Sequence, residues 1–233
     1  MPVESKERVI KSMEHIYKNV EKKRESSKKK ILDVAMDLFY EVGYEKTTTR
    51  LIVQRAGIRN GSLYYMFANK EEIFKEIMLN AFKDALVESE SLFDSDMDFI
   101  TELTFPIALE LYTASKSKRI AELLYQAHSS WSVLDSFVGI ICDWVVAHSS
   151  VSSHMIKAKE THANILAVMG VVGNIIGEFA NTDDELDYKV VLKTVMEVFC
   201  IVFKYPLFNM DEVINEIRDK VESGNIVICG HNF

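Results

Sequence analysis

Apolar side chains recur at helical spacing along most of the chain, and no segment shows the strict alternation that is typical of a surface strand. Between residues 27 and 42 they fall three or four positions apart, which places them on one face of a helix. Gly43 follows directly and can adopt the positive φ that ends many helices. The pattern predicts an all-α fold, whose first well-marked helix buries Ile31, Ala35, Leu38, Phe39 and Val42.

Three shorter helices are predicted next. The first begins near Thr48, a favourable N-cap, and ends at Gly57. The second spans about residues 60–67, and the third opens at Asn69, which can cap the helix while Glu72 reaches back. A helix, a glycine turn and a second helix form a helix-turn-helix, in which the second helix lies in the DNA major groove.

About six further helices are predicted in the rest of the chain. Two potential capping boxes, one at residues 182–185 and one at residues 209–212, indicate where the last two helices begin. The predicted helices span residues 99–115, 118–127, 132–148, 156–180, 184–204 and 210–223. The fold class is therefore an N-terminal helix-turn-helix domain of three or four helices followed by a larger helical domain.

The charge is distributed unevenly. The 233-residue chain has a net charge of −8, yet residues 1–70 hold 15 Lys and Arg against 9 Asp and Glu, and the remainder holds 12 against 26. A basic segment attached to an acidic body is expected where only the first part meets a polyanion. A solvated basic helix without a partner would show the same charge pattern, so charge alone leaves both interpretations open.

Several classes of protein are disfavoured. The three cysteines are far apart, which argues against a disulfide framework or a zinc finger and favours a reducing compartment. Residues 1–20 lack an apolar signal segment, and the apolar run 165–177 is too short to span a bilayer and contains Asn174. We therefore expect a cytoplasmic protein that does not associate with a membrane. No metal is expected either, because the spacing of the possible ligands is irregular: Cys142, His148, His154 and His162.

The stretch AGIRNGSLYYMF, residues 56–67, carries the chemistry that the helix-turn-helix requires. Arg59 and Asn60 are the residue types that pair with guanine and adenine through two hydrogen bonds, and they stand at the start of the second helix. Small residues beside them allow the backbone to approach the duplex, and hydroxyls at helix starts can reach phosphates. The expected partner is double-stranded DNA, with these candidate contacts: Thr48, Thr49, Arg50, Arg59, Asn60, Gly61, Ser62, Tyr64, Tyr65 and Lys70.

The segment TTTRLIVQRAGIRNGSLYYMFANKEEIF, together with ILDVAMDLFYEVGYEKTT before it, resembles the DNA-binding signature of the tetracycline-repressor (TetR) family. The resemblance covers about residues 30–82. It implies that DNA is contacted by these residues: Thr49, Arg50, Asn60 to Ser62, Tyr64, Tyr65 and Lys70, which binds phosphate. Two positions depart from the pattern: Arg59 replaces the usual Ser or Thr cap, and Met66 replaces a residue that is commonly aromatic or His.

The resemblance also implies how such a protein works. Members are typically homodimers whose variable C-terminal domain binds a small molecule and thereby changes the spacing of two DNA-binding heads. We expect a repressor that a largely apolar effector releases from a pseudo-palindromic operator. The alternative is an interaction or architectural protein that keeps the fold without effector-controlled operator binding. The chain contains no catalytic or nucleotide-binding motif, so we expect neither an enzyme nor a cofactor.

The predicted helices 156–180 and 184–204 are the candidates for a dimer interface. Three glycines on one helix face would let another helix approach closely. Two such helices from each subunit could form a four-helix bundle. Intrachain packing or a ligand cavity would explain the same glycines. The candidate interface consists of Gly170, Gly173, Gly177, Val191, Val195, Val198, Phe199 and Val202.

Aromatic residues on the middle helices are the candidates for an effector pocket, since such sites are largely apolar with a few polar groups. A plain helical core has the same composition, and for most of these residues that is the simpler interpretation. His128 and Trp131 stand one helical turn apart, so a continuous helix would bring them together. The candidates are Phe105, Tyr112, Tyr125, His128, Trp131, Phe137 and Trp144.

The chain begins before the family domain. Residues 3–25 have a mixed-charge helical pattern, and the basic end, residues 22–30, leads into the first domain helix. An extra helix that attracts phosphates and a solvated helix that packs on the body are both consistent with this pattern. The predicted domains are an N-terminal extension at 1–26, the DNA-binding domain at 27–82, and the effector-binding and dimerisation domain at 83–233.

Overall fold

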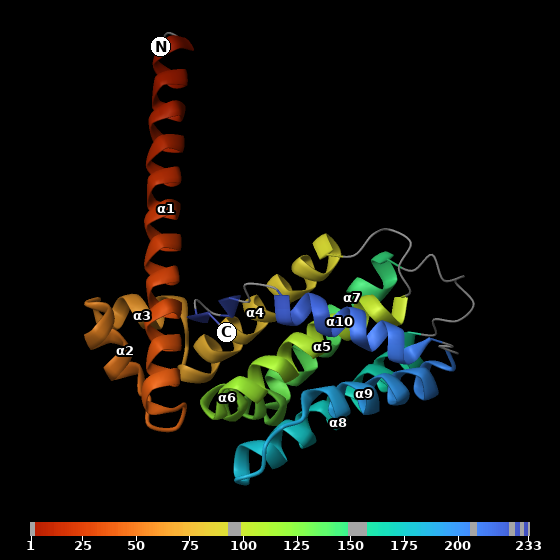
Figure 1. The fold of residues 1–233 in the computed structure, drawn as a ribbon. Coiled ribbons are helices and arrows are strands. Elements are labelled where there is room, and N and C mark those ends of the chain that lie inside the picture. Colours follow the sequence, from red (N-terminus) through yellow and green to blue (C-terminus); the bar gives the residue numbers. More distant parts are fainter. Residues whose placement is uncertain are drawn as a thin grey trace. The chain divides into compact units, whose positions relative to one another are not determined.

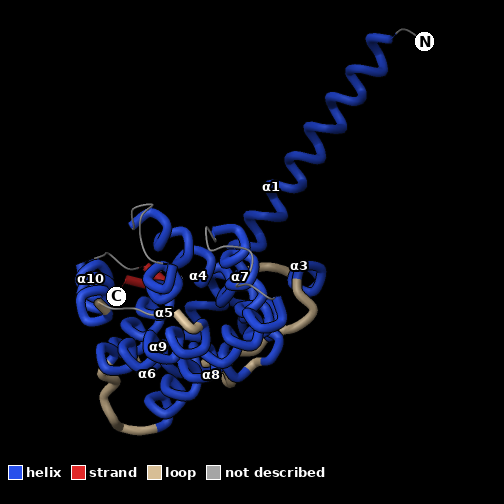
Figure 2. The backbone as a smooth tube through the Cα atoms, turned by 90° about the vertical axis from the view of Figure 1, so that its right-hand side faces the viewer, coloured by secondary structure: helices blue, strands red, loops and turns tan. Residues whose placement is uncertain are grey.

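The computed structural model describes residues 3–92, 99–148, 158–205, 209–223, 227–228 and 231–232. Helices make up nearly all of them, which confirms the predicted all-α class (Figure 1). The only strands among the described residues are β1 (Val227–Ile228) and β2 (His231–Asn232), an antiparallel pair of two residues each, drawn red in Figure 2.

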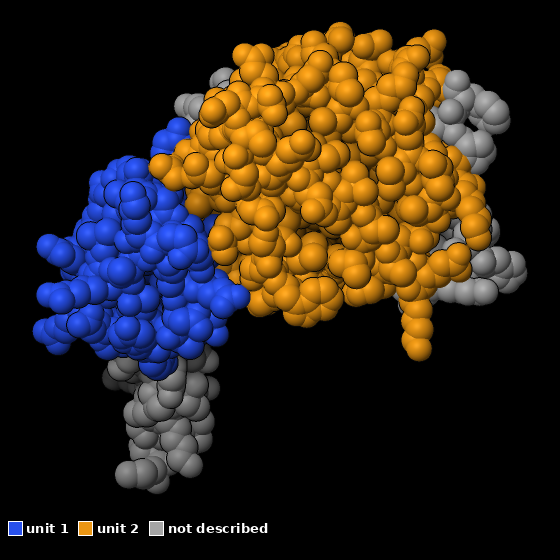
Figure 3. Space-filling view, turned by 90° about the horizontal axis from the view of Figure 1, so that it is seen from below, with its two compact units in different colours: residues 1–74 blue, residues 75–233 orange. Residues whose placement is uncertain are grey.

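The chain divides into two compact units, residues Met1–Phe74 and Lys75–Phe233, coloured blue and orange in Figure 3. The division falls inside α4 (Lys70–Leu92), whose first turn belongs to the first unit. The predicted boundary after residue 82 lies further along the same helix, and the three functional domains remain a prediction.

The first unit contains α1 (Val3–Val42), α2 (Thr49–Ala56) and α3 (Asn60–Met66). The long α1 is one continuous helix of 40 residues, visible as a single rod in Figures 1 and 2. The expectation of a separate extension helix was therefore wrong. The sequence from 3 to 42 contains neither glycine nor proline, so no residue in it disfavours continuation of the helix.

The core of the first unit follows the predicted helical face. Ile31, Ala35, Leu38 and Phe39 are almost completely buried, whereas Val42, at the end of α1, is exposed and does not share the core as expected. An aromatic cluster closes this core: the ring centroids of Phe39, Tyr44 and Phe74 lie 4.7–5.5 Å apart in pairs. Gly43 has a φ of 91°, as the sequence predicts for a residue that ends a helix.

The described part of the second unit contains six helices after α4, and each corresponds to a predicted helix. They are α5 (Phe99–Lys116), α6 (Lys118–Ser129), α7 (Trp131–His148), α8 (Ala158–Asn181), α9 (Tyr188–Phe203) and α10 (Met210–Ser223). Within this unit, α8 packs against α6, α7 and α9, and α5 packs against α6, α9 and α10.

The start of α9 differs from the prediction. The expected capping box at residues 182–185 would begin the helix near Asp184, but α9 begins at Tyr188. Asp187 is the N-cap, because its carboxylate accepts hydrogen bonds from the backbone N–H groups of Lys189 and Val190 at 3.1 and 3.3 Å. Thr182 instead accepts a 3.4 Å hydrogen bond from Asp184 within the preceding turn.

Helix α8 (Ala158–Asn181) extends beyond the apolar run 165–177 that the sequence analysis considered. Residues Lys159–Asn181 are long and apolar enough to cross a membrane by length and composition alone, so the expectation that this region is too short was wrong. A core helix of a globular unit passes the same test, and α8 packs against α5, α6, α7 and α9. Its buried side carries Ile165, Val168, Met169, Val172 and Ile176.

Candidate nucleic-acid interface

The turn between α2 and α3 is built as the sequence predicts. Thr48 caps α2, and its hydroxyl oxygen accepts a 3.2 Å hydrogen bond from the backbone N–H of Leu51. Gly57 ends α2 in the left-handed conformation, with φ 63° and ψ 34°. Arg59 is extended and makes no side-chain cap, so α3 begins at Asn60.

Helix α3 is held in the first unit by one side only. Leu63 is completely buried and Phe67, directly after the helix, is 3% exposed. The opposite side is open: Tyr64 and Tyr65 are 56% and 75% exposed. A half-buried packing role for Tyr65, which the sequence left open, is therefore ruled out. The remaining candidate base contacts are also exposed, namely Arg59, Asn60, Gly61 and Ser62.

The start of α2 lies against the exposed side of α3. The hydroxyl oxygens of Thr49 and Tyr64 lie 3.2 Å apart and share a hydrogen bond. Arg50, in the first turn of α2, is exposed. Arg55, near the end of α2, donates to both carboxylate oxygens of Glu41 on α1, one at 2.8 Å, and this bond lowers the pKa of Glu41.

Lys70 has a structural contact that the sequence did not predict. Its ammonium donates a 2.7 Å hydrogen bond to the backbone carbonyl of Tyr44 and lies 4.0 Å from the centroid of the Tyr44 ring. Glu72 and Asn69 cap the start of α4, since Asn69 accepts from the N–H of Glu72 and Glu72 accepts from the N–H of Ala68. Lys70 thus joins the start of α4 to the turn after α1, and its contact with phosphate remains a prediction.

Two basic side chains of α1 reach the same region; both belong to the basic end that the sequence singled out, but their contacts with rings near α3 were not predicted. The guanidinium carbon of Arg24 lies 5.5 Å from the ring centroid of Tyr65, and the ammonium of Lys28 lies 5.6 Å from that of Phe67. Arg24, Lys28 and the buried Ile31 are spaced i, i+4 and i+7. This spacing was the available signal, because it places both cations on the side of α1 that faces the core.

The effector candidates gather only in part: the rings of His128 and Phe137 lie 6.2 Å apart, edge to face, but the other candidates do not form one site with them. Phe105, Phe137 and Trp144 are buried in the core, which matches the simpler interpretation. Trp131 is 64% exposed and does not meet His128, because α6 ends at Ser129 and α7 begins at Trp131. The predicted pairing of His128 with Trp131 is therefore wrong.

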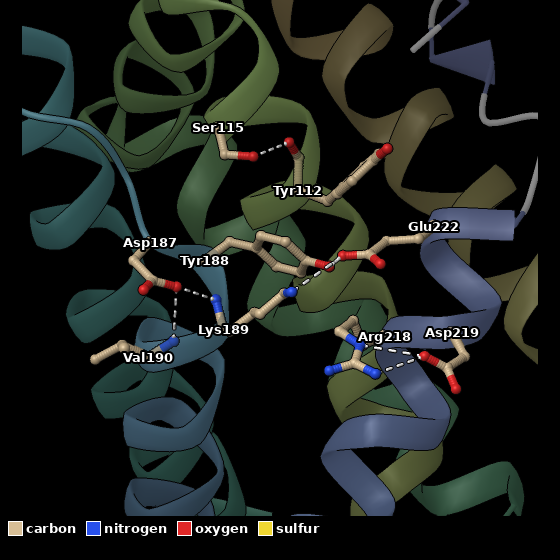
Figure 4. Close-up of polar contacts among 9 residues, drawn as sticks. All are labelled: Tyr112, Ser115, Asp187, Tyr188, Lys189, Val190, Arg218, Asp219 and Glu222. Carbon is tan, nitrogen blue, oxygen red and sulfur yellow. Dashed lines mark hydrogen bonds and ion pairs between the residues drawn. The ribbon is translucent and has the colours of Figure 1, made fainter.

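Tyr112 belongs to a polar junction of α5, α9 and α10, shown in Figure 4. Its ring meets the edge of Tyr188, with centroids 5.4 Å apart, and Lys116 lies 4.8 Å from its centroid. The hydroxyl of Tyr188 donates to Glu222, and the ammonium of Lys189 lies 3.7 Å from the same carboxylate oxygen. Burial and the bond to Glu222 raise the pKa of Tyr188 far above its ordinary value.

His128 has a buried carboxylate partner. Its Nε2 lies 2.6 Å from a carboxylate oxygen of Glu110 on α5, and the two side chains are only 3% and 10% exposed. Its Nδ1 is buried without a hydrogen-bond partner among the described residues. Against this ring lies Gly173 of α8, where an added Cβ would come within 2.7 Å of the His128 Cβ.

The glycine face of α8 serves packing within the chain at two of its three positions. Gly173 lies against His128, and an added Cβ at Gly177 would come within 2.4 Å of the Tyr125 ring. The assignment of these two glycines to a dimer interface was therefore wrong, since α6 already covers them. Gly170 has open space around its Cβ position.

The candidate dimer-interface residues on α9 also fall into two groups, one buried within the chain and one partly accessible. Val195 and Phe199 are buried in the second unit's own core, which corrects their assignment. Val191, Val198 and Val202 are half-buried. On the same helix, Val190 and Ile201 are 61% and 73% exposed, and sequence reasoning did not single them out.

No group of three His, Cys, Asp or Glu in the described part of the chain could hold a metal ion. Cys142 and Cys200 are half-buried and form no disulfide among the described residues, and burial raises the pKa of the Cys142 thiol. His154 and Cys229 lie outside the described residues.

The first unit is a helix-turn-helix DNA-binding domain, with a buried leucine behind α3 and polar, aromatic residues on its open side. Residues 31–77 match the family model for bacterial regulatory proteins of the tetR family. Over these residues the chain is similar to the DNA-binding domain of that family.

Curated relatives match over this domain. The chain is 46% identical over 55 residues to the biofilm operon negative regulator IcaR of Staphylococcus epidermidis, and 49% identical over 51 residues to the regulator QacR of Staphylococcus aureus. It is 33% identical over 72 residues to the uncharacterised regulator YhgD of Bacillus subtilis. These matches cover 24%, 22% and 31% of this chain, and 30%, 27% and 38% of the relatives' lengths.

Solved structures resemble the fold over most of the chain. A TetR-family regulator from Syntrophomonas wolfei has a TM-score of 0.57 at 16% identity, covering 79% of this chain and 98% of that one. The repressor SmeT of Stenotrophomonas maltophilia has a TM-score of 0.53 at 18% identity, covering 78% and 92%. At these identities the likeness concerns the fold alone.

Proposed function

We propose that this chain is a DNA-binding transcriptional regulator, a repressor that acts in the cytoplasm as a homodimer on a pseudo-palindromic operator. The second unit binds a small-molecule effector and has no enzymatic role. The observation that carries the proposal is the open side of α3. Arg59, Asn60, Gly61 and Ser62 are exposed at its start, while Leu63 fixes its other side in the core.

The exposed residues divide by their chemistry. Arg59 and Asn60 carry the groups that discriminate base pairs in the major groove. Thr48, Thr49 and Tyr64 carry hydroxyls that suit phosphates, and Lys70 adds a positive charge beside them. Phosphate contacts fix the register of the domain on the duplex, so the residues at the start of α3 can then contact base edges.

A homodimer follows from the operator's symmetry. A two-fold protein places two α3 helices in major grooves one helical turn, roughly 34–36 Å, apart. The candidate interface is the outward side of α8 and α9, where Gly170, Val190, Val191, Val198 and Ile201 remain exposed or half-buried. Ile201→Asp places a charge on this side and is expected to shift the protein to a monomer in light-scattering measurements.

Effector control is expected to act through the second unit. An effector that binds better to one arrangement of the dimer shifts the population toward it, and an arrangement with altered head spacing releases the operator. Of the candidate effector contacts we retain Tyr125 and His128, which both lie on the side of α6 that faces α8. The buried pair of His128 and Glu110 supplies polar groups in otherwise apolar surroundings, which suits a largely apolar ligand with one polar function.

The test is selection of bound duplexes from a random pool by the purified protein. We expect an inverted repeat, and we expect Asn60→Ala/Tyr64→Ala to abolish the enrichment. The matched control is Asn80→Ala/Trp131→Ala, which removes an exposed amide and an exposed aromatic ring from the second unit. If the wild type enriches no sequence and binds DNA only weakly, the chain is an interaction protein with this fold and the proposal is wrong.

A further inference from the structure

We propose that the basic turns of α1 before the domain core, residues 18–30, form a second DNA-contact element. They bind phosphates of the duplex that flanks the site contacted by α3. The inference rests on the proposed function, because it extends the same interface.

The first step is position. The side of α3 that is open to a duplex carries Tyr65, and Arg24 lies over the ring of this residue. The turn of α1 around residue 24 therefore lies beside the DNA-facing side of α3. Lys28, one turn later, contacts Phe67 and fixes this stretch of α1 against the end of α3.

The second step is direction. Because α1 is unbroken from Val3 to Val42, the helix continues past Arg24 toward its N-terminus without a hinge. The 21 further residues to Val3 rise by about 32 Å at 1.5 Å per residue. Figure 1 shows this part of α1 extending well beyond α2 and α3.

The third step is charge. Residues 18–30 hold seven Lys and Arg against two Glu. Lys22 and Lys23 are exposed and make no ion pair with any described residue. Lys29 pairs with Asp33 at 2.7 Å, but both side chains are largely exposed, so the pair exchanges readily for a phosphate. This charge sits in a chain whose net charge is −8.

The fourth step is exposure. Every residue from 18 to 26 is exposed, including Val20 at 61%. A helix that buries no side gains no stability from a core, and its exposed cations around the whole circumference suit a polyanion.

The experiment compares Lys22→Ala/Lys23→Ala with the control Lys83→Ala/Lys159→Ala. The control removes the same two charges from exposed positions of the second unit. Alanine keeps helix propensity high at all four positions, and unchanged thermal unfolding confirms that both variants are folded. Operator affinity is measured against salt concentration for the wild type and both variants.

Neutralising a phosphate contributes about −0.9 to the slope of log K against log salt. We expect the Lys22/Lys23 variant to lose about 0.9 of slope for each contact removed, and the control to match the wild type. Equal slopes for all three proteins would overturn the proposal.

Duplex length provides a second measurement. Trimming the DNA to the inverted repeat should weaken binding by the wild type, while the Lys22/Lys23 variant should bind long and trimmed duplexes equally. If the wild type is indifferent to flanking DNA, the extension makes no contact there. If instead the variant changes the oligomeric state and leaves the slope intact, the extension pairs with a second copy of the chain and the proposal is wrong.

These outcomes are distinct from failure of the proposed function. If the wild type selects no operator, the function itself fails. If the wild type selects an operator with unchanged affinity in the Lys22/Lys23 variant, the function stands and only the second contact element is rejected.

Discussion

The hydroxyl oxygens of Thr49 and Tyr64 lie 3.2 Å apart, although fifteen residues of chain separate them. One residue lies at the start of α2 and the other on the open side of α3. Their hydrogen bond holds the Tyr64 ring in a defined position on a surface where it is 56% exposed. The two helices therefore present one connected set of hydroxyl groups to a ligand.

Thr49→Val and Tyr64→Phe each remove this bond while they preserve the shape of the side chain. An exposed hydrogen bond contributes about 0.5–1 kcal/mol, so each variant should bind operator DNA roughly 2–5-fold more weakly. The double variant should lose less than the sum of the two, because both substitutions remove the same bond. Fluorescence anisotropy measures all four proteins, and strictly additive losses would show that the two hydroxyls act independently.

Gly57→Ala should destabilise the first unit. Gly57 has a φ of 63°, and an added Cβ meets nothing within 4 Å, so the cost is backbone strain alone, roughly 1 kcal/mol. Thermal unfolding measures the loss.

Gly61→Ala is the companion substitution with the opposite sign. Gly61 is helical with open space at its Cβ position, and alanine should raise stability by up to about 1 kcal/mol. It also places a methyl group on the open side of α3 and should weaken operator binding. Tighter binding by Gly61→Ala would mean that the backbone of α3 does not approach the duplex at this position.

Gly173→Ala should destabilise the second unit by about 1–3 kcal/mol, the range typical of an overpacked core. The new Cβ would lie 2.7 Å from the Cβ of His128, an atom that cannot move without its backbone. The control is Gly139→Ala on α7, where nothing lies within 4 Å and alanine should be neutral or stabilising. Denaturant unfolding compares the two, and equal stability would show that α6 and α8 separate easily.

The contribution of the junction in Figure 4 to the free energy of unfolding should decrease at alkaline pH. The pKa of Tyr188 is raised above its ordinary value of 10.0, so the folded state retains the phenol proton that the unfolded state loses. The contribution is complete below about pH 10 and declines as pH rises above it. Tyr188→Phe removes this decline, so wild type and variant should differ more at pH 8 than at pH 11 in urea unfolding. If the difference in unfolding free energy between wild type and Tyr188→Phe is the same at both pH values, the raised pKa of Tyr188 is contradicted.

Local signals in the sequence predicted the DNA-binding domain well. The cap at Thr48, the left-handed Gly57 and the inward Leu63 each depend on a few neighbouring residues, so the pattern of types is sufficient. Exposure of Tyr64 and Tyr65 follows from the position of Leu63 on a helix of 3.6 residues per turn.

The errors arose where contacts between distant segments decide the outcome. Gly173 and Gly177 resemble a helix-crossing face, but their neighbours His128 and Tyr125 belong to α6, and the sequence does not give the register of α6 against α8. Asp187 and Asp184 are both good caps, and the sequence did not distinguish which one begins α9. A break at Ser130 separates His128 from Trp131, and one-turn spacing alone does not reveal it.

The unbroken course of α1 has a consequence for its angular phase. In an α-helix each residue turns the chain by about 100°, so everything before Arg24 is fixed in rotation by the buried Ile31. One inserted residue between these two would swing Lys18, Lys22 and Lys23 by more than a quarter turn around the axis. An insertion of seven residues, about two turns, would return these side chains to nearly the same direction around the helix axis. The segment can therefore change in length only in steps that preserve which way its cations point.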